Sequence, residues 1–355
     1  MKRYRHVCLS ALFSGLFFLV LFGSAVAADY VGSEACATCH QQHHNDVVVS
    51  GHPYKLSRAE DARRRGTPLP QGYQWSDIAY VIGGAHKKIR YINKQGYIIT
   101  AAKDGSELAT QYNLETGTWV FYHKGEKKPY DCGRCHTTGY QAEGHQDGLP
   151  GIKGTWAAPG IQCEACHGPG SKHAKTRKKG DILVDRASTL CGTCHYRGET
   201  DTIPADGGFI RHHEQFNELL AGPHRSLSCV SCHNPHKRAR LGIKRSCVNC
   251  HVVQARAFDG STMQQVGVVC IDCHMPRAGK SAVAKSATEG DIRTHLFRIN
   301  TDVSAQMFFD QTQDGKKQHF ARPYLTLDFA CLNCHKNKDK PWAAAMAKGI
   351  HAYGK

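Results

Sequence analysis

The stretch that decides the fold is CEACHGPGSKH at residues 163–173, where two cysteines three positions apart are followed at once by a histidine. With this spacing the two thiols can add to the two vinyl groups of one haem, and the histidine then lies under the iron as an axial ligand. Residues 163–167 therefore predict covalent attachment and ligation of one c-type haem.

The same Cys-x-x-Cys-His unit occurs eight times, and apart from Cys8 no cysteine lies outside it. We therefore expect eight covalently bound c-type haems. The predicted attachment residues are Cys36, Cys39, Cys132, Cys135, Cys163, Cys166, Cys191, Cys194, Cys229, Cys232, Cys247, Cys250, Cys270, Cys273, Cys331 and Cys334. The predicted proximal iron ligands are His40, His136, His167, His195, His233, His251, His274 and His335.

Two other uses of paired cysteines explain this pattern less well. A zinc ribbon also pairs Cys-x-x-Cys units, but it requires no histidine after the second cysteine. A disulfide scaffold uses an even number of cysteines in a secreted chain, yet a histidine after every pair has no purpose there.

The N-terminus predicts export from the cytoplasm. Basic residues at positions 2, 3 and 5 precede the apolar run 7–22, and the small residues 23–27 resemble a cleavage site. Residues 1–27 are therefore expected to be a signal peptide, discarded together with Cys8, and an uncleaved anchor is the alternative. We expect a periplasmic or extracellular protein that meets membranes only through its partners.

The formal net charge of +16 does not predict nucleic-acid binding. Sixteen propionates on eight haems would offset much of this charge, so many lysines and arginines are expected to neutralise cofactor. The basic runs 63–65 and 175–179 are either solvated surface or docking sites for partner proteins.

The second axial ligands are expected to be histidines. After the signal peptide the chain has four methionines, which cannot close eight irons, and it has fourteen histidines beyond the eight proximal ones. His236 lies three residues beyond His233, too close along the chain to reach across the same porphyrin. We therefore expect His236 to serve a neighbouring haem.

Several segments resemble the cytochrome c554-like multihaem family, of which this chain would be an octahaem member. The resemblance rests on residues 32–52, 132–140, 163–173 and 229–236. It implies His52, His173 and His236 as distal ligands, with His123, His213, His224 and His295 next. His351 completes the set of eight.

Glycine and proline interrupt the runs between the motifs and leave only short helical stretches. The sequence therefore predicts a fold that is mostly α with extensive loops, a small N-terminal β-meander and a haem-packed core. Between the first two motifs, residues 78–82, 88–93 and 96–100 alternate like strands, and helices are expected at 213–221 and 341–348. We expect an N-terminal haem-binding region with the meander at 28–130 and a dense multihaem region at 131–355, in one continuous body.

Three functions are consistent with eight His-terminated motifs. The first is a periplasmic or extracellular electron carrier in anaerobic respiration, with a quinol-linked or periplasmic donor and an outer-membrane or terminal reductase as acceptor. The second is an octahaem reductase or oxidase of the tetrathionate, nitrite or hydroxylamine type. The third is a subunit of an extracellular cytochrome filament or another homo-oligomer. The sequence leaves it undecided whether the protein is an enzyme, and it favours the carrier.

Covalent attachment at every motif predicts an intact mass that exceeds the processed polypeptide by eight haems. All of this haem should stay with the protein in acid–acetone extraction, because thioether bonds survive it. A count of seven or fewer in fully matured protein would contradict this prediction.

Overall fold

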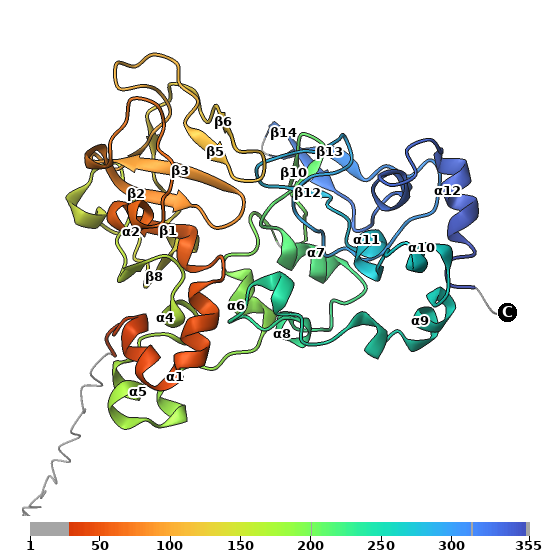
Figure 1. Ribbon diagram of the computed structural model, residues 1–355, viewed down its shortest axis with the longest axis horizontal. Helices are drawn as coiled ribbons and strands as arrows, with labels where there is room; N and C mark the ends of the chain where they lie inside the picture. Colours follow the sequence, from red (N-terminus) through yellow and green to blue (C-terminus); the bar gives the residue numbers. More distant parts are fainter. Residues whose placement is uncertain (1–27, 200, 314, 353–355) are drawn as a thin grey trace, which may run out of the picture.

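The computed structural model describes residues 28–199, 201–313 and 315–352, and the predicted signal peptide lies outside these ranges (Figure 1). In the described part, no helix is long and apolar enough to cross a membrane.

The helices are short and separated by long loops. The longest is α1 (Ser33–Val48), which bends at His40, where the backbone leaves helical geometry. The other α-helices are α2 (Ala59–Arg64), α3 (Gly133–His136), α4 (Cys163–His167), α5 (Ser171–Thr176), α6 (Ser188–Gly192), α7 (Gln215–Ala221), α8 (Cys229–Cys232), α9 (Val252–Phe258), α10 (Thr262–Gln265), α11 (Cys270–His274) and α12 (Lys340–Ala347). The two helices predicted from the sequence correspond to α7 and α12.

Each Cys-x-x-Cys-His unit lies on or beside a helical turn. Six of these turns belong to α1, α3, α4, α6, α8 and α11, and the other two are η6 (Cys247–Asn249) and η7 (Asp328–Leu332). Residues three apart share one face of a helical turn, so the two thiols of a unit are presented together. The local fold therefore suits attachment of both thiols to one planar group.

The predicted β-meander is confirmed and is part of a larger sheet. Its strands are β2 (Ile78–Gly83), β3 (Lys88–Asn93) and β4 (Tyr97–Ile98), paired antiparallel in that order. The same sheet also contains β1 (Leu56–Arg58), β5 (Gln111–Asn113), β6 (Thr118–Val120) and β7 (Lys128–Pro129).

Strands outside the meander make the fold less helical than predicted, with about 31% helix and 18% strand. They are β8 (Thr137–Thr138), β9 (Ala158–Pro159), β10 (Ala205–Asp206), β11 (Phe209–Arg211), β12 (Gly279–Lys280), β13 (Phe308–Gln313) and β14 (Lys316–Ala321). The hairpin of β13 and β14 was not predicted, because its consecutive aromatic and polar residues lack the alternation that indicates a strand.

Hydrophobic side chains form cores at the two ends of the chain but not in its middle. Two clusters pack against the N-terminal sheet, around Tyr80 and Tyr91, and a third surrounds Leu325. Within residues 223–275, Ala257 is the one buried hydrophobic residue, whereas Val253 and Val266 are largely exposed. Side chains alone do not give this middle segment a core, which agrees with the prediction that haem supplies it.

Polar contacts join segments that are distant in the sequence. The turn between β2 and β3 reaches the loop 281–291, where the Lys87 ammonium donates to the Asp291 carbonyl oxygen at 2.7 Å. The Glu164 carboxylate, buried in α4, accepts hydrogen bonds from the backbone N–H groups of Val31 and Gly32 at 2.9 Å, and of Gly170 at 2.7 Å. Glu164 therefore fixes the start of α1 against the third motif.

Replacing Glu164 with Ala should lower the free energy of unfolding by about 3 kcal/mol, because three backbone N–H groups would lose their acceptor. Glu164→Gln keeps one carbonyl acceptor and should lower it less. The free energy is measured by urea unfolding of the haem-loaded protein, with the exposed Glu143→Ala as the matched control. Equal stability of Glu164→Ala and the control would show that this contact does not hold α1.

Candidate functional site

Six motif histidines each face a second histidine ring across a gap that one iron can fill. Two imidazoles on opposite sides of an iron have ring centroids about 6 Å apart, since each Fe–N bond is about 2 Å long and the ring centre lies about 1 Å further. The observed centroid separations are 6.2 Å for His40 and His173, 6.3 Å for His195 and His52, 6.1 Å for His167 and His236, 6.1 Å for His233 and His295, 5.7 Å for His251 and His224, and 5.9 Å for His274 and His351.

The facing histidine never comes from the motif that precedes it in the chain. His236 follows the fifth motif by three residues, yet its ring is parallel to that of His167 in the third motif, at 5°. His173 follows the third motif and faces His40 of the first. These pairs tie distant segments together, as the position of His236 predicts.

Hydrogen bonds orient several of these imidazoles. Nδ1 of His167 donates to the Leu183 carbonyl oxygen at 2.7 Å, and Nδ1 of His274 donates to that of Phe297 at 2.8 Å. His195 donates in the same way to the Gln215 side chain at 3.1 Å. A hydrogen on Nδ1 leaves the Nε2 lone pair available, and outer-sphere partners of this kind hold metal-binding histidines in place.

Burial keeps several candidate ligands neutral, which is the form that binds a metal. Burial, together with the charges of His195 and Lys55, lowers the pKa of His52 to about 4. Burial also lowers the pKa of His295 to about 3. The backbone N–H of His295 is held by the carboxylate of buried Glu218.

Neighbouring motifs lie against each other. The first meets the third, where the Ser33 hydroxyl contacts the Cys163 sulfur at 3.5 Å. The second meets the fourth, where the Cys194 sulfur lies 3.9 Å from the Arg134 carbonyl oxygen. Interacting thiol pairs connect the remaining motifs in series: Cys166 with Cys194, Cys191 with Cys229, Cys232 with Cys247, Cys247 with Cys270, and Cys273 with Cys331. None of the sixteen cysteines is in a disulfide.

Two motif histidines lack a facing imidazole among the residues that the structure describes. The ring of His136 lies 6.4 Å from that of Tyr130, and the ring of His335 lies 4.8 Å from that of Trp342. The structure does not bring His123 or His213, both predicted as distal ligands, into such a pair. His123 Nδ1 lies 2.8 Å from the Glu126 carboxylate, and the ring of His213 is tilted by 40° against that of His212, with centroids 3.8 Å apart.

A group of cations near His136 was not predicted from the sequence. Burial lowers the pKa of His136 to about 3, and the charges of Lys55, Arg197, His213 and Arg90 lower it further. The side chains of Lys55, Arg90 and Arg197 come from three separate parts of the chain, so no local sequence motif predicts that they lie near one another. A cavity of about 380 Å³ lies beside the same motif, lined by Asp131, Cys132, Arg134, Cys135, Thr193, Tyr196, Arg197 and Gly198.

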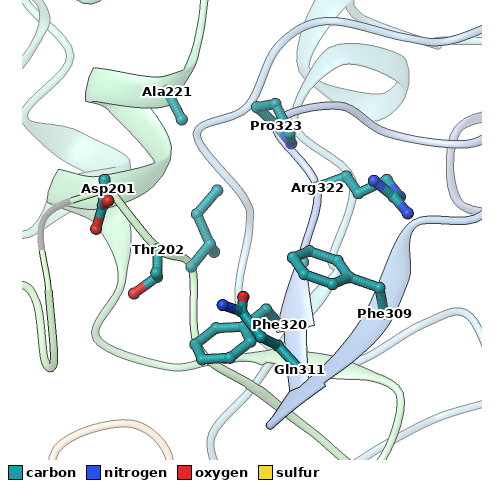
Figure 2. A pocket seen from close by; sticks show the side chains of 10 residues that line it. Asp201, Thr202, Ala221, Phe309, Gln311, Phe320, Arg322 and Pro323 are labelled. Atoms are coloured by element: carbon teal, nitrogen blue, oxygen red, sulfur yellow. The ribbon is translucent and has the colours of Figure 1, made fainter. Parts of the chain in front are cut away.

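A second cavity, of about 450 Å³, contains none of the predicted ligands. It lies between the loop 201–203 and the hairpin of β13 and β14, with Phe309 and Phe320 on one wall (Figure 2). The Arg322 guanidinium covers the Phe309 ring at 4.8 Å. No histidine or cysteine lines it, so this cavity is separate from the motif array.

Comparison with known proteins gives two family matches and one curated relative. The family described as cytochrome c3 matches residues 155–252, and that described as cytochrome c554 and c-prime matches residues 99–168. The relative is the multiheme cytochrome MtrA of Shewanella baltica (strain OS185), 25% identical over 163 residues, or 41% of this chain. The match spans 45% of the length of that relative.

Three solved structures share the fold. The outer cell wall cytochrome OcwA superposes with a TM-score of 0.61 at 20% identity, covering 89% of this chain and 86% of that one. The octaheme sulfite reductase MccA of Wolinella succinogenes gives 0.62 at 16% identity, covering 86% and 65%. The undecaheme cytochrome from the S-layer of Carboxydothermus ferrireducens gives 0.54 at 18% identity, covering 90% and 60%.

Replacing His236 with Ala should disturb the haem attached at Cys163 and Cys166, because the His236 ring faces His167. One haem should become high-spin in electron paramagnetic resonance (EPR) of the oxidised protein. The matched control is His319→Ala, since His319 lies beside Asp310 and away from the motifs. To identify the haem, the EPR spectrum of the single variant His167→Ala is compared with that of His236→Ala. Both variants should perturb the same haem signal. A perturbed haem at Cys229 and Cys232 would contradict the assignment.

Proposed function

Because the chain belongs to the multihaem c-type cytochromes, we propose that it carries eight covalent haems and moves electrons between partner proteins outside the cytoplasm. The proposed irons are held by the motif histidines. Six of these irons take a second histidine as their distal ligand: His52, His173, His224, His236, His295 and His351. The bound haems supply one-electron chemistry, and the role in anaerobic respiration is part of the proposal.

The observation that carries this proposal is the set of six facing imidazole pairs. An iron held by two histidines has no free position for a substrate, so it can pass electrons without binding one. Two nitrogen ligands also favour the ferric state relative to a histidine and a methionine sulfur. The six pairs therefore support low-potential electron transfer as the main activity.

The arrangement of the motifs supports a continuous route. Atomic contacts or electrostatic interactions between cysteines link the first motif through the third, fourth, fifth, sixth and seventh to the eighth, with the second beside the fourth. The first motif lies on α1 and the eighth lies on η7, next to α12. Figure 1 places α1 and α12 at opposite sides of the molecule. Electrons could thus enter at one side and leave at the other.

Partners and location are further parts of the proposal. The N-terminal segment has the features of an export signal, and two similar structures are described as an outer cell wall and an S-layer cytochrome. We therefore place the protein in the periplasm or at the cell surface. A quinol-linked or periplasmic donor would reduce it, and an outer-membrane or terminal reductase would oxidise it.

The carrier function predicts reversible reduction of all haems by a reduced dye, with midpoint potentials below those of histidine–methionine cytochromes. The potentials should spread over a range, because nearby irons and propionates repel each added electron. A spectroelectrochemical titration measures both properties. Assays with reduced dye and nitrite, hydroxylamine or tetrathionate should show no enzyme-like turnover.

Two results would favour the alternative functions. Sustained substrate-dependent dye oxidation would contradict the carrier and support an octahaem reductase or oxidase. Fibres in electron microscopy of the purified protein would instead support a filament subunit, whereas the carrier predicts dispersed particles.

A further inference from the structure

The segment that contains the fifth and sixth motifs is strongly basic. Residues 219–258 contain seven lysines and arginines and no aspartate or glutamate. The two haems proposed for this segment would bring four propionates, so three positive side-chain charges would remain. The propionates of its own haems therefore do not account for all of this charge.

Most of these cations lie on one exposed loop, residues 237–245, which we call the basic loop. Its five exposed cations are Lys237, Arg238, Arg240, Lys244 and Arg245. Four of them form no ion pair with any residue that the structure describes, and Lys237 reaches only the Asp46 carboxylate, at 3.9 Å. By contrast, Arg64 of α2 forms an ion pair with Asp61. The charge of the basic loop is therefore available to a partner from outside the chain.

Two apolar side chains lie among the cations of the basic loop. Leu241 is 68% exposed and Ile243 is 53% exposed. Protein interfaces combine an apolar centre with a polar rim, and exposed apolar side chains of this kind are typical of docking sites. A nucleic acid presents little apolar surface, so the combination favours an acidic protein as the partner.

The backbone of the basic loop is fixed to the fifth motif. The Lys244 N–H donates to the Cys232 carbonyl oxygen at 2.8 Å, and Ile243 forms an isolated antiparallel bridge with His233. A protein that binds the loop would therefore lie beside the fifth haem. Figure 1 places α8, which carries this motif, between α1 and α12. The basic loop thus lies near the middle of the proposed route and at neither of its ends.

We propose that the basic loop is the docking surface for an acidic electron-transfer protein, which exchanges single electrons with the fifth haem. In the reducing direction, one electron leaves the reduced centre of the partner and converts the ferric haem to the ferrous state, and no bond forms or breaks. Opposite charges speed the encounter, and Leu241 adds apolar contact to the complex. This inference deepens the proposed function and rests on it, because it requires a haem at the fifth motif.

The test measures reduction of the haem-loaded full chain by flavodoxin hydroquinone in a stopped-flow spectrometer. Flavodoxin is the probe because it is an acidic protein that donates single electrons. The double variant Arg240→Glu/Lys244→Glu should lower the second-order rate constant at low salt by roughly tenfold or more, because it removes the electrostatic steering. Added salt should slow the reaction of the unmodified protein and change that of the variant much less.

The matched control is Lys94→Glu/Lys153→Glu, which makes the same change in net charge at two exposed lysines outside the basic loop. Its rate constant should fall by less than about twofold. A reduced viologen dye is the second control: it is a small cation, so Arg240→Glu/Lys244→Glu should not slow its reaction. The single variant Leu241→Ser should weaken binding of flavodoxin by roughly fivefold and leave the salt dependence unchanged. It keeps the test usable if the charge variant fails to fold, because Leu241 is exposed.

Four results would overturn the docking surface. Equal rate constants in the charge variant and its control would do so, and would leave the carrier function intact. So would a flavodoxin that fails to reduce the unmodified protein while the dye succeeds. A changed midpoint potential with an unchanged flavodoxin rate would assign the cations to haem propionates. Binding to phosphatidylglycerol vesicles that only the charge variant loses, again with an unchanged flavodoxin rate, would assign the loop to a membrane surface. Failure of both flavodoxin and dye would instead contradict the proposed function itself.

Discussion

The separation of about 6 Å that one iron imposes on two axial imidazoles is the constraint on which the rest of this structure depends. Each facing histidine comes from a different segment than the motif it serves, so every pair closes a long loop. The middle of the chain has almost no buried hydrophobic residue, and exposed valines surround its motifs. Imidazole pairs and haem faces would therefore do there what a hydrophobic core does at the two ends of the chain.

The motifs and the meander could be predicted from the sequence because both are local patterns. A histidine directly after Cys-x-x-Cys is recognised as a proximal ligand from its position alone. The residues of β2 and β3 show the alternation that is typical of strands. The hairpin at residues 308–321 could not be predicted, because its faces are set by packing against residues 203–204 and not by its own alternation. The sequence prediction of a mostly helical fold also omitted the short strands that connect the loops.

The distal ligands show where sequence reasoning ends. Fourteen spare histidines limit the choice, the family resemblance points to seven and His351 completes the predicted eight, of which six lie opposite a motif histidine in the structure. The other two, His123 and His213, contact the Glu126 carboxylate and the His212 ring. The pairing is thus a property of the fold, while the supply of histidines is a property of the composition.

An experimental density map of the haem-loaded protein tests this account most directly, because it shows which side chain lies on each side of every iron. The account predicts His236 opposite His167 on one iron, and His52 opposite His195 on another. A map in which His236 binds the iron of its own motif, or in which His52 binds any iron other than that of His195, would contradict it.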